Sequence, residues 1–118
     1  MTVQFIKELL NARVLAGNEI LDREVYTACG SDMMSDVLAH VDDQSVLITG
    51  LCNPQVLRTA EMMDIVCVIM VRDKCPDDAM IKMAKDRNIC LITTALPMFT
   101  ACGLLYSAGL RGGGSHGK

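Results

Sequence analysis

The sequence predicts an α/β fold in which a mostly parallel sheet is covered by helices on both faces. Three segments are apolar at every position, and each leads through a polar or proline-containing turn into a helical pattern: residues 46–48, 65–71 and 89–92. An unbroken apolar run is typical of a strand buried on both faces, whereas a strand with one solvated face alternates. The gaps between the runs, residues 51–64 and 72–88, have the length of a crossover helix with two short loops. We therefore expect three layers connected by right-handed strand-helix-strand units.

The first part of the chain adds one helix and two strands. Residues 2–11 predict a short amphipathic helix with Thr2 as its N-cap. Its apolar stripe consists of Val3, Ile6, Leu9 and Leu10. Residues 13–16 read as a short strand that ends in a turn at Gly17, and residues 25–29 read as a core strand.

Two helices are predicted on either side of the strand at residues 46–49. Ser31 or Asp32 is suited to cap the first helix, and Asn53 with Pro54 at the first helical position is suited to cap the second. The apolar positions of the first helix are Met33, Met34, Val37, Leu38 and Val41. The buried face of the second is Val56, Leu57, Ala60 and Met63.

The last third of the sequence predicts two more helices and a tail. Residues 77–87 form a helix that is acidic at its start and basic towards its end, as the helix dipole favours. Its inward face is Met80, Met83 and Ala84. After Pro97 comes a final helix that stops near Gly109. Residues 111–118 are rich in glycine, so we expect one domain over residues 1–110 followed by a flexible tail.

Composition narrows the class of protein. The 118 residues are enough for one domain with its own core, and 51% of them are apolar. The net charge is -3 and the basic residues are scattered, which argues against nucleic acid as a partner. No apolar run approaches the roughly 20 residues that span a bilayer, and the start lacks a signal-peptide pattern, so we expect a cytoplasmic protein without membrane contact.

The surplus of apolar residues also suggests self-association. The chain has nine methionines and only four aromatic residues, so aliphatic side chains must fill the interior. Methionine also suits adaptable interfaces, and the pairs Met33-Met34 and Met62-Met63 are candidates to face a second subunit. A homodimer is the simplest way to cover such a surface.

The predicted ligand site lies where the loops after the core strands meet, at the carboxyl edge of the sheet. Ligands of open parallel sheets bind at this edge, where helix N-termini attract anions. The candidate contacts are Ser31, Asp32, Thr49, Gly50, Asn53, Arg72, Thr93 and Thr94. Their hydroxyl and amide groups suit a nucleotide or a small anionic metabolite, with Arg72 or Lys74 supplying charge. The competing interpretation is that Ser31, Asp32, Asn53 and Thr94 only cap helices and turns.

Two other kinds of site are weaker alternatives. Asp32 and Asp36 are four residues apart, so on a helix they would share a face and could act as an acid and base pair or hold a cation. Cys29, Cys52 and Cys75 lie at or just beyond the ends of predicted strands and could meet as a thiolate cluster. The sequence has no C-x-x-C pair, and long spacings are a poor match to a metal site. A small enzyme or a metal-cluster accessory protein is therefore the alternative to a non-catalytic ligand-binding domain, and no cofactor is identified.

With these elements in place, the stretch from Val3 to Leu110 resembles the stand-alone DRTGG domain family, which is related in fold to the amino-terminal domain of HPr kinase/phosphorylase. The residues that carry the resemblance lie in segments 12–17, 22–25, 31–37 and 89–94, and at Phe99, Ala101, Leu105 and Tyr106. The sequence departs from the family in the loops that often carry Gly-Asp-Arg and Thr-Gly-Gly. The corresponding loops here are residues 49–53 and 71–73.

The resemblance implies a Rossmann-like domain. Such domains are often regulatory and are attached to nucleotide-sensing modules or metabolic enzymes, or are encoded alone near redox enzymes. A regulatory or accessory role, with a small anionic ligand or a metabolic enzyme as partner, is therefore the leading expectation.

Overall fold

A computed structural model describes residues 1–41 and 44–112, with the backbone alone at His40. It contains a six-stranded sheet with the order β1-β5-β4-β3-β2-β6. The strands are β1 (Arg13–Ala16), β2 (Thr27–Gly30), β3 (Ser45–Thr49), β4 (Cys67–Met70), β5 (Cys90–Thr93) and β6 (Arg111–Gly112). The helices are α1 (Val3–Leu9), α2 (Met34–His40), α3 (Pro54–Met62), α4 (Asp78–Asp86) and α5 (Met98–Ser107), with a 3-10 turn η1 (Asn18–Ile20).

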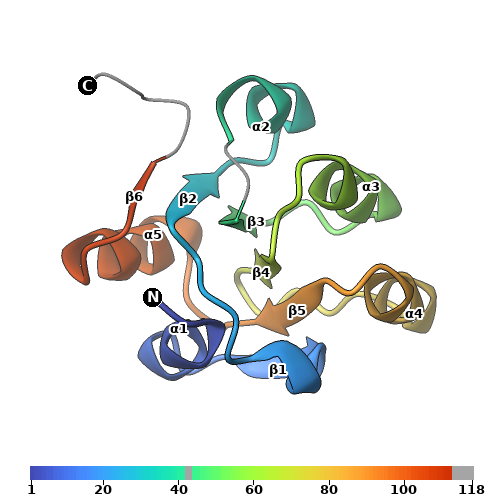
Figure 1. The fold of residues 1–118 in the computed structure, drawn as a ribbon, viewed down its shortest axis with the longest axis horizontal. Helices are drawn as coiled ribbons and strands as arrows, with labels where there is room; N and C mark the ends of the chain where they lie inside the picture. Colours follow the sequence, from blue (N-terminus) through green and yellow to red (C-terminus); the bar gives the residue numbers. More distant parts are fainter. Residues whose placement is uncertain (42–43, 113–118) are drawn as a thin grey trace.

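The strands β2, β3, β4 and β5 are adjacent and parallel, and the helices connect them in three layers (Figure 1). The crossovers α2, α3 and α4 lie on one face of the sheet, while α1 and α5 cover the other. The predicted three-layer, mostly parallel α/β fold is confirmed. Among the described residues, no helix combines the length and apolarity needed to cross a membrane.

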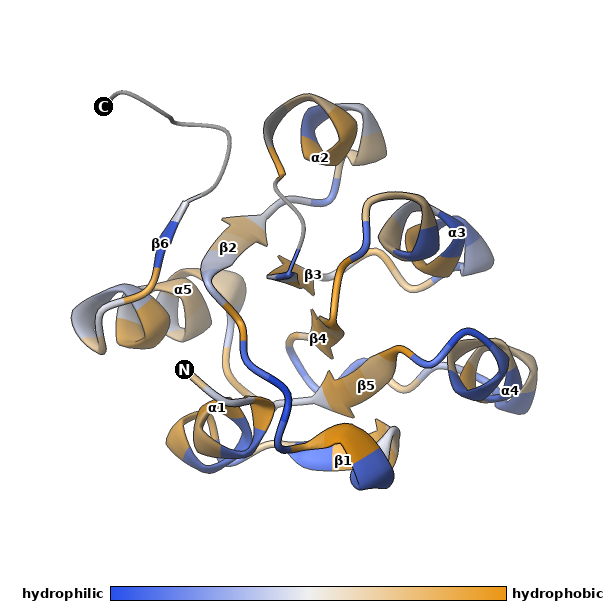
Figure 2. Cartoon of the chain, viewed as in Figure 1, coloured by the Kyte–Doolittle hydropathy of each residue, from blue (hydrophilic) through white to orange (hydrophobic). Residues whose placement is uncertain are grey.

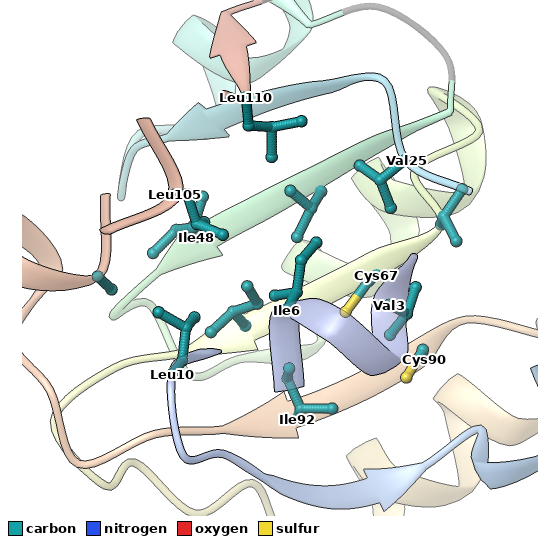
Figure 3. Close-up of a cluster of buried hydrophobic side chains, with 14 of the residues drawn as sticks. Val3, Ile6, Leu10, Val25, Ile48, Cys67, Cys90, Ile92, Leu105 and Leu110 are labelled. Carbon is teal, nitrogen blue, oxygen red and sulfur yellow. The ribbon is translucent and has the colours of Figure 1, made fainter. Parts of the chain in front are cut away.

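The core is divided into two clusters by the sheet, because successive side chains of a strand point to opposite faces. Val46, Ile48 and Ile69 pack towards α1 and α5, whereas Leu47 and Val68 pack towards the crossover helices. Strands β3, β4 and β5 are buried throughout, and they are apolar except for Ser45, Thr49 and Thr93 at their ends (Figure 2). Figure 3 shows α1 lying across the sheet, with Val3 and Ile6 near the thiols of Cys67 and Cys90 and with Leu10 at the other end of the helix. Aliphatic and sulfur-containing side chains therefore fill the interior, as the composition predicts.

Strand β1 is the exception to the parallel arrangement. It pairs antiparallel with β5, with Arg13 opposite Thr93, and its register shifts between Val14 and Ala16. At Gly17 the chain turns with φ 93°, and a Cβ at this position would lie 2.7 Å from the Cα of Cys90. Only glycine allows this close approach without a shift of the backbone. The glycine thus lets the chain turn directly over β5.

Helix α2 differs from the sequence prediction. It begins at Met34 with Met33 as its N-cap, and no side chain caps it. Met33 is 61% exposed and Leu38 is 46% exposed, so these two of the five apolar positions do not join the buried stripe of the helix. The reason is that Ser31 and Asp32 belong to the loop, which delays the helix and leaves only Met34, Val37 and the following Val41 buried.

The other helices agree more closely with their predicted faces. In α3 and α4 the predicted inward residues Met63 and Met83 are half-buried, and the rest are buried. At the end of α5 the chain turns at Gly109, which has φ 113°. The start of the expected tail is ordered into the sheet, since Arg111 and Gly112 pair with β2. Residues 113–118 of the expected tail lie outside the described residues.

Candidate ligand site at the carboxyl edge of the sheet

The carboxyl ends of β2, β3, β4 and β5 form a row, so the loops that follow them are neighbours. The chain leaves β4 towards α4 on one face and leaves β5 towards α5 on the other (Figure 1). A point where adjacent strands diverge in this way is the usual location of a ligand in an open α/β sheet. The predicted convergence of the loops is therefore present.

The loop after β2 is joined to the loop after β3 through one carboxylate. Asp32 Oδ1 accepts hydrogen bonds from Thr49 Oγ1 at 3.1 Å and from the Gly50 backbone N–H at 2.7 Å. Thr49 Oγ1 also accepts from Leu51 N–H at 3.1 Å. Ser31 Oγ accepts from the N–H of Met33 at 3.0 Å. These residues brace the two loops against each other, and neither Ser31 nor Asp32 caps α2.

The start of α3 behaves as the sequence predicts. Asn53 is its N-cap, its side-chain Oδ1 accepts from Gln55 N–H at 2.9 Å, and Pro54 follows at the first helical position. The amide oxygen therefore satisfies one of the backbone donors that a helix leaves unpaired at its N-terminus. This capping role accounts for Asn53.

Thr93 and Thr94 lie at the end of β5, are almost completely buried, and connect three segments. Thr93 Oγ1 donates to the Lys74 carbonyl at 2.8 Å. Thr94 Oγ1 donates to the Leu10 carbonyl at 2.8 Å and accepts from Leu96 N–H at 3.3 Å. Their hydroxyl groups hold the loop after β4 and the end of α1 against the sheet.

The loop after β4 carries cationic side chains on a tightly fixed backbone. Arg72 and Asp73 have φ values of 57° and 56°, in the left-handed region that residues other than glycine rarely adopt. Their N–H groups donate to the carbonyls of Leu96 and Thr94 at 2.9 and 2.8 Å. These bonds to the β5 loop hold the unusual turn in place.

Arg13 adds a third cationic residue next to this loop. It begins β1, lies opposite Thr93, and its Nη2 contacts the Sγ of Cys75 at 3.6 Å. Arg13, Arg72 and Lys74 are exposed and form what we call the cationic rim. None of the three makes an ion pair with a carboxylate of the described residues. Sequence reasoning singled out Arg72 and Lys74 but missed Arg13, because its position depends on the antiparallel pairing of β1.

The alternative sites find no support in the geometry. Asp32 precedes α2 and bonds to the neighbouring loop, whereas Asp36 lies in the first turn of the helix, so the two do not share a helical face as expected. Across residues 1–41 and 44–112, no three His, Cys, Asp or Glu residues are grouped closely enough to hold a metal ion. Cys29, Cys52 and Cys75 are free thiols that do not form such a cluster.

The thiols near the site differ in their surroundings. Burial raises the pKa of the Cys52 thiol, and the nearby ammonium of Lys74 opposes that shift. Burial also raises the pKa of Cys29, with a further contribution from Asp36. Both thiols are therefore held in the protonated form at neutral pH, which disfavours a role as nucleophile.

Comparisons with known proteins agree with the fold. The crystal structure of the CBS and DRTGG domains of the regulatory region of Clostridium perfringens pyrophosphatase, complexed with the activator diadenosine tetraphosphate, matches with a TM-score of 0.73 and 19% sequence identity. The match covers 88% of this chain and 45% of that chain, so this chain spans less than half the length of that structure. No match was found among curated proteins.

A comparison with protein-family models addresses the family directly. The expected relation to HPr kinase/phosphorylase stays a prediction. The model of the DRTGG domain matches residues 5–108, which is most of the sequence. The chain therefore belongs to the DRTGG domain family.

Proposed function

We propose that this chain is a non-catalytic regulatory domain that binds a small anionic ligand, such as a nucleotide, at the carboxyl edge of its sheet. The domain then communicates to a metabolic enzyme whether the ligand is bound. The family supports this role, because the solved relative is part of the regulatory region of a pyrophosphatase and is complexed with a nucleotide activator. The chain of that relative is longer, so the ligand and the partner proposed here are inferred from the residues of the present chain.

The cationic rim is the observation that carries the proposal. Arg13, Arg72 and Lys74 surround the point where β4 and β5 diverge, and their charges are not neutralised by ion pairs with described carboxylates. Of the nearby acids, Asp77 accepts from Met80 N–H as the cap of α4, while Asp73 lies exposed in the same loop. Guanidinium groups suit phosphate because they offer several N–H donors in a fixed plane.

The predicted contact residues divide into two roles under this proposal. Arg72 contacts the anion, together with Arg13 and Lys74. The others position the loops: Ser31, Asp32, Thr49, Gly50, Asn53, Thr93 and Thr94. Asp32, Thr49, Thr93 and Thr94 bond to other segments of the chain, and Ser31 and Asn53 fix the local backbone before α2 and α3, which supports this division. A site braced before the ligand arrives loses less conformational entropy on binding.

A thermal-shift screen with pyrophosphate, ATP and dinucleoside polyphosphates tests the ligand. A ligand present at about 100 times its Kd stabilises the folded state by about 2.7 kcal/mol, which raises the melting temperature measurably. The double variant Arg72→Ala with Lys74→Ala should abolish the shift. The double variant Arg58→Ala with Lys85→Ala, which removes two exposed cations from α3 and α4, is the charge-matched control and should keep it.

The proposal is contradicted if no anionic compound shifts the melting temperature, or if the rim variant and the control respond equally. Raising the salt concentration provides an independent check, because screening weakens exposed electrostatic contacts. The stabilisation by pyrophosphate should therefore fall as salt rises.

We also propose that the domain is a homodimer. Met33, Leu38 and Met62 are exposed on the layer of crossover helices, and burying them favours association. Of the two methionine pairs in the prediction, Met34 is buried and Met63 is half-buried within the chain, so one member of each pair is available. Sedimentation velocity should give the mass of a dimer that Leu38→Glu dissociates, whereas a monomer at every concentration would contradict this part of the proposal.

A further inference from the structure

A second surface with different chemistry lies at the opposite, amino edge of the sheet. The start of α1, the segment leading into β2 and the end of α5 border an open hollow of about 570 Å³ on the surface. Phe5, Glu24 and Tyr26 line one part of it, and Ala108 lines another. The buried residues Val25 and Leu110 also line it and supply an apolar floor. A hollow of this volume has the size of a small-molecule site.

The aromatic residues of the chain point to what this hollow holds. All four are exposed: Phe5 is 46% exposed, Tyr26 64%, Tyr106 61% and Phe99 90%. Phe5 and Tyr26 both line the hollow, although neither is needed to complete the aliphatic core. Large aromatic side chains of this kind bind flat apolar groups through their faces while the tyrosine hydroxyl stays solvated.

The charge of the lining restricts the ligand further. Among the described residues that line the hollow, none is a lysine or an arginine. The carboxylate of Glu24 accepts from the amino group of Met1 at 2.9 Å, and the same amino group donates to the Val25 carbonyl at 3.4 Å. The N–H groups of Gly109 and Leu110 donate to carbonyls of α5. The walls therefore offer aromatic faces and the second oxygen of the Glu24 carboxylate, while the amino group of Met1 is already paired with Glu24 and is not free for a phosphate.

We infer that this hollow binds a planar heteroaromatic ring that carries N–H donors and no negative charge, such as the base of a nucleoside. The ring stacks on Phe5 or Tyr26 and donates to the carboxylate of Glu24. The inference does not depend on the cationic rim, because the hollow lies at the other edge of the sheet. The hollow would bind an uncharged ring, whereas the rim would bind an anion.

Titration with adenosine, which lacks phosphate, tests this site in the full chain. Amide chemical shifts should change at Phe5, Val25, Tyr26 and Gly109. Loss of one stacking face in Tyr26→Leu should raise the Kd about tenfold, within the range measured for bases stacked on aromatic side chains. Ala108→Leu, at an exposed position, should also raise the Kd because it fills the hollow and leaves its walls intact.

Two controls separate this site from the proposed function. Phe99→Leu removes an aromatic ring that does not line the hollow, and Arg72→Ala with Lys74→Ala removes the rim, so both should leave the Kd for adenosine unchanged. The inference is overturned if adenosine produces no shifts or shifts elsewhere, or if Phe99→Leu weakens binding as much as Tyr26→Leu. It is also overturned if Tyr26→Leu and Ala108→Leu change the sedimentation of the free protein, because a second copy would then occupy the hollow.

Discussion

The two edges of the sheet differ in how their polar groups are used. At the carboxyl edge, Asp32 and Thr49 join the loops after β2 and β3, while Thr93 and Thr94 bond to the carbonyls of Lys74 and Leu10. The exposed side chains of the cationic rim take no part in these hydrogen bonds among the described residues. At the amino edge, the hollow is lined by aromatic faces and by a carboxylate with an amine partner. The comparison shows that polar residues at strand ends can be structural while adjacent exposed residues carry the recognition chemistry.

Thr94→Val should have the largest effect on stability at the carboxyl edge. The hydroxyl bonds to the buried Leu10 carbonyl and to the partly buried Leu96 N–H, so its loss removes the partner of both groups. We expect the free energy of unfolding to fall by about 1–3 kcal/mol, measured by urea denaturation. Thr100→Val, at an exposed position of α5, is the matched control. If the two variants are equally stable, the bracing role of Thr94 is wrong.

Asp32→Ala should have a smaller effect, because the carboxylate is exposed although it accepts from Thr49 and Gly50. We expect a loss of about 1 kcal/mol in the free energy of unfolding and faster hydrogen exchange at Gly50. Asp22→Ala removes an exposed acid whose side chain forms no hydrogen bond with the described residues, and it should change neither quantity. Unchanged exchange at Gly50 in Asp32→Ala would show that the two loops are not held together by this residue.

The accessibility of the thiols gives a further test of the carboxyl edge that does not depend on the free energy of unfolding. Cys75 is exposed beside the cationic rim, whereas burial raises the pKa of Cys29 and Cys102 and keeps both protonated at neutral pH. Alkylation at pH 7 should therefore modify Cys75 first, as read by mass spectrometry. Because a raised pKa delays formation of the thiolate, Cys29 and Cys102 should react only as the pH rises. Modification of either one ahead of Cys75 would contradict this arrangement.

Much of the fold could be predicted because the core strands are apolar at every position and the intervening segments have the length of a helix. The Asn53-Pro54 cap and the turn at Gly109 could be predicted for the same kind of local reason. The antiparallel pairing of β1 and the strand order could not, because they depend on contacts between distant segments. The placement of Arg13 beside the loop after β4 follows from that pairing.

The candidate site was predicted in part. The loops meet at the carboxyl edge as expected, because parallel strands that follow one another place their ends in a row. The roles of Ser31 and Asp32 could not be read from the sequence, since a residue that precedes a helix can cap it or bond elsewhere. Because Ser31 and Asp32 remain in the loop, α2 starts later, at Met34. The exposure of Met33 and Leu38 follows from this later start.

Titration of the ¹⁵N-labelled chain with pyrophosphate tests most directly whether the carboxyl edge is the anion site. We predict amide shifts concentrated in residues 72–75 and 94–96, at the junction of the β4 and β5 loops, and their loss in Arg72→Ala with Lys74→Ala. Shifts at Phe5, Tyr26 and Gly109 instead, or no saturable shifts at all, would contradict the assignment of anion recognition to the cationic rim.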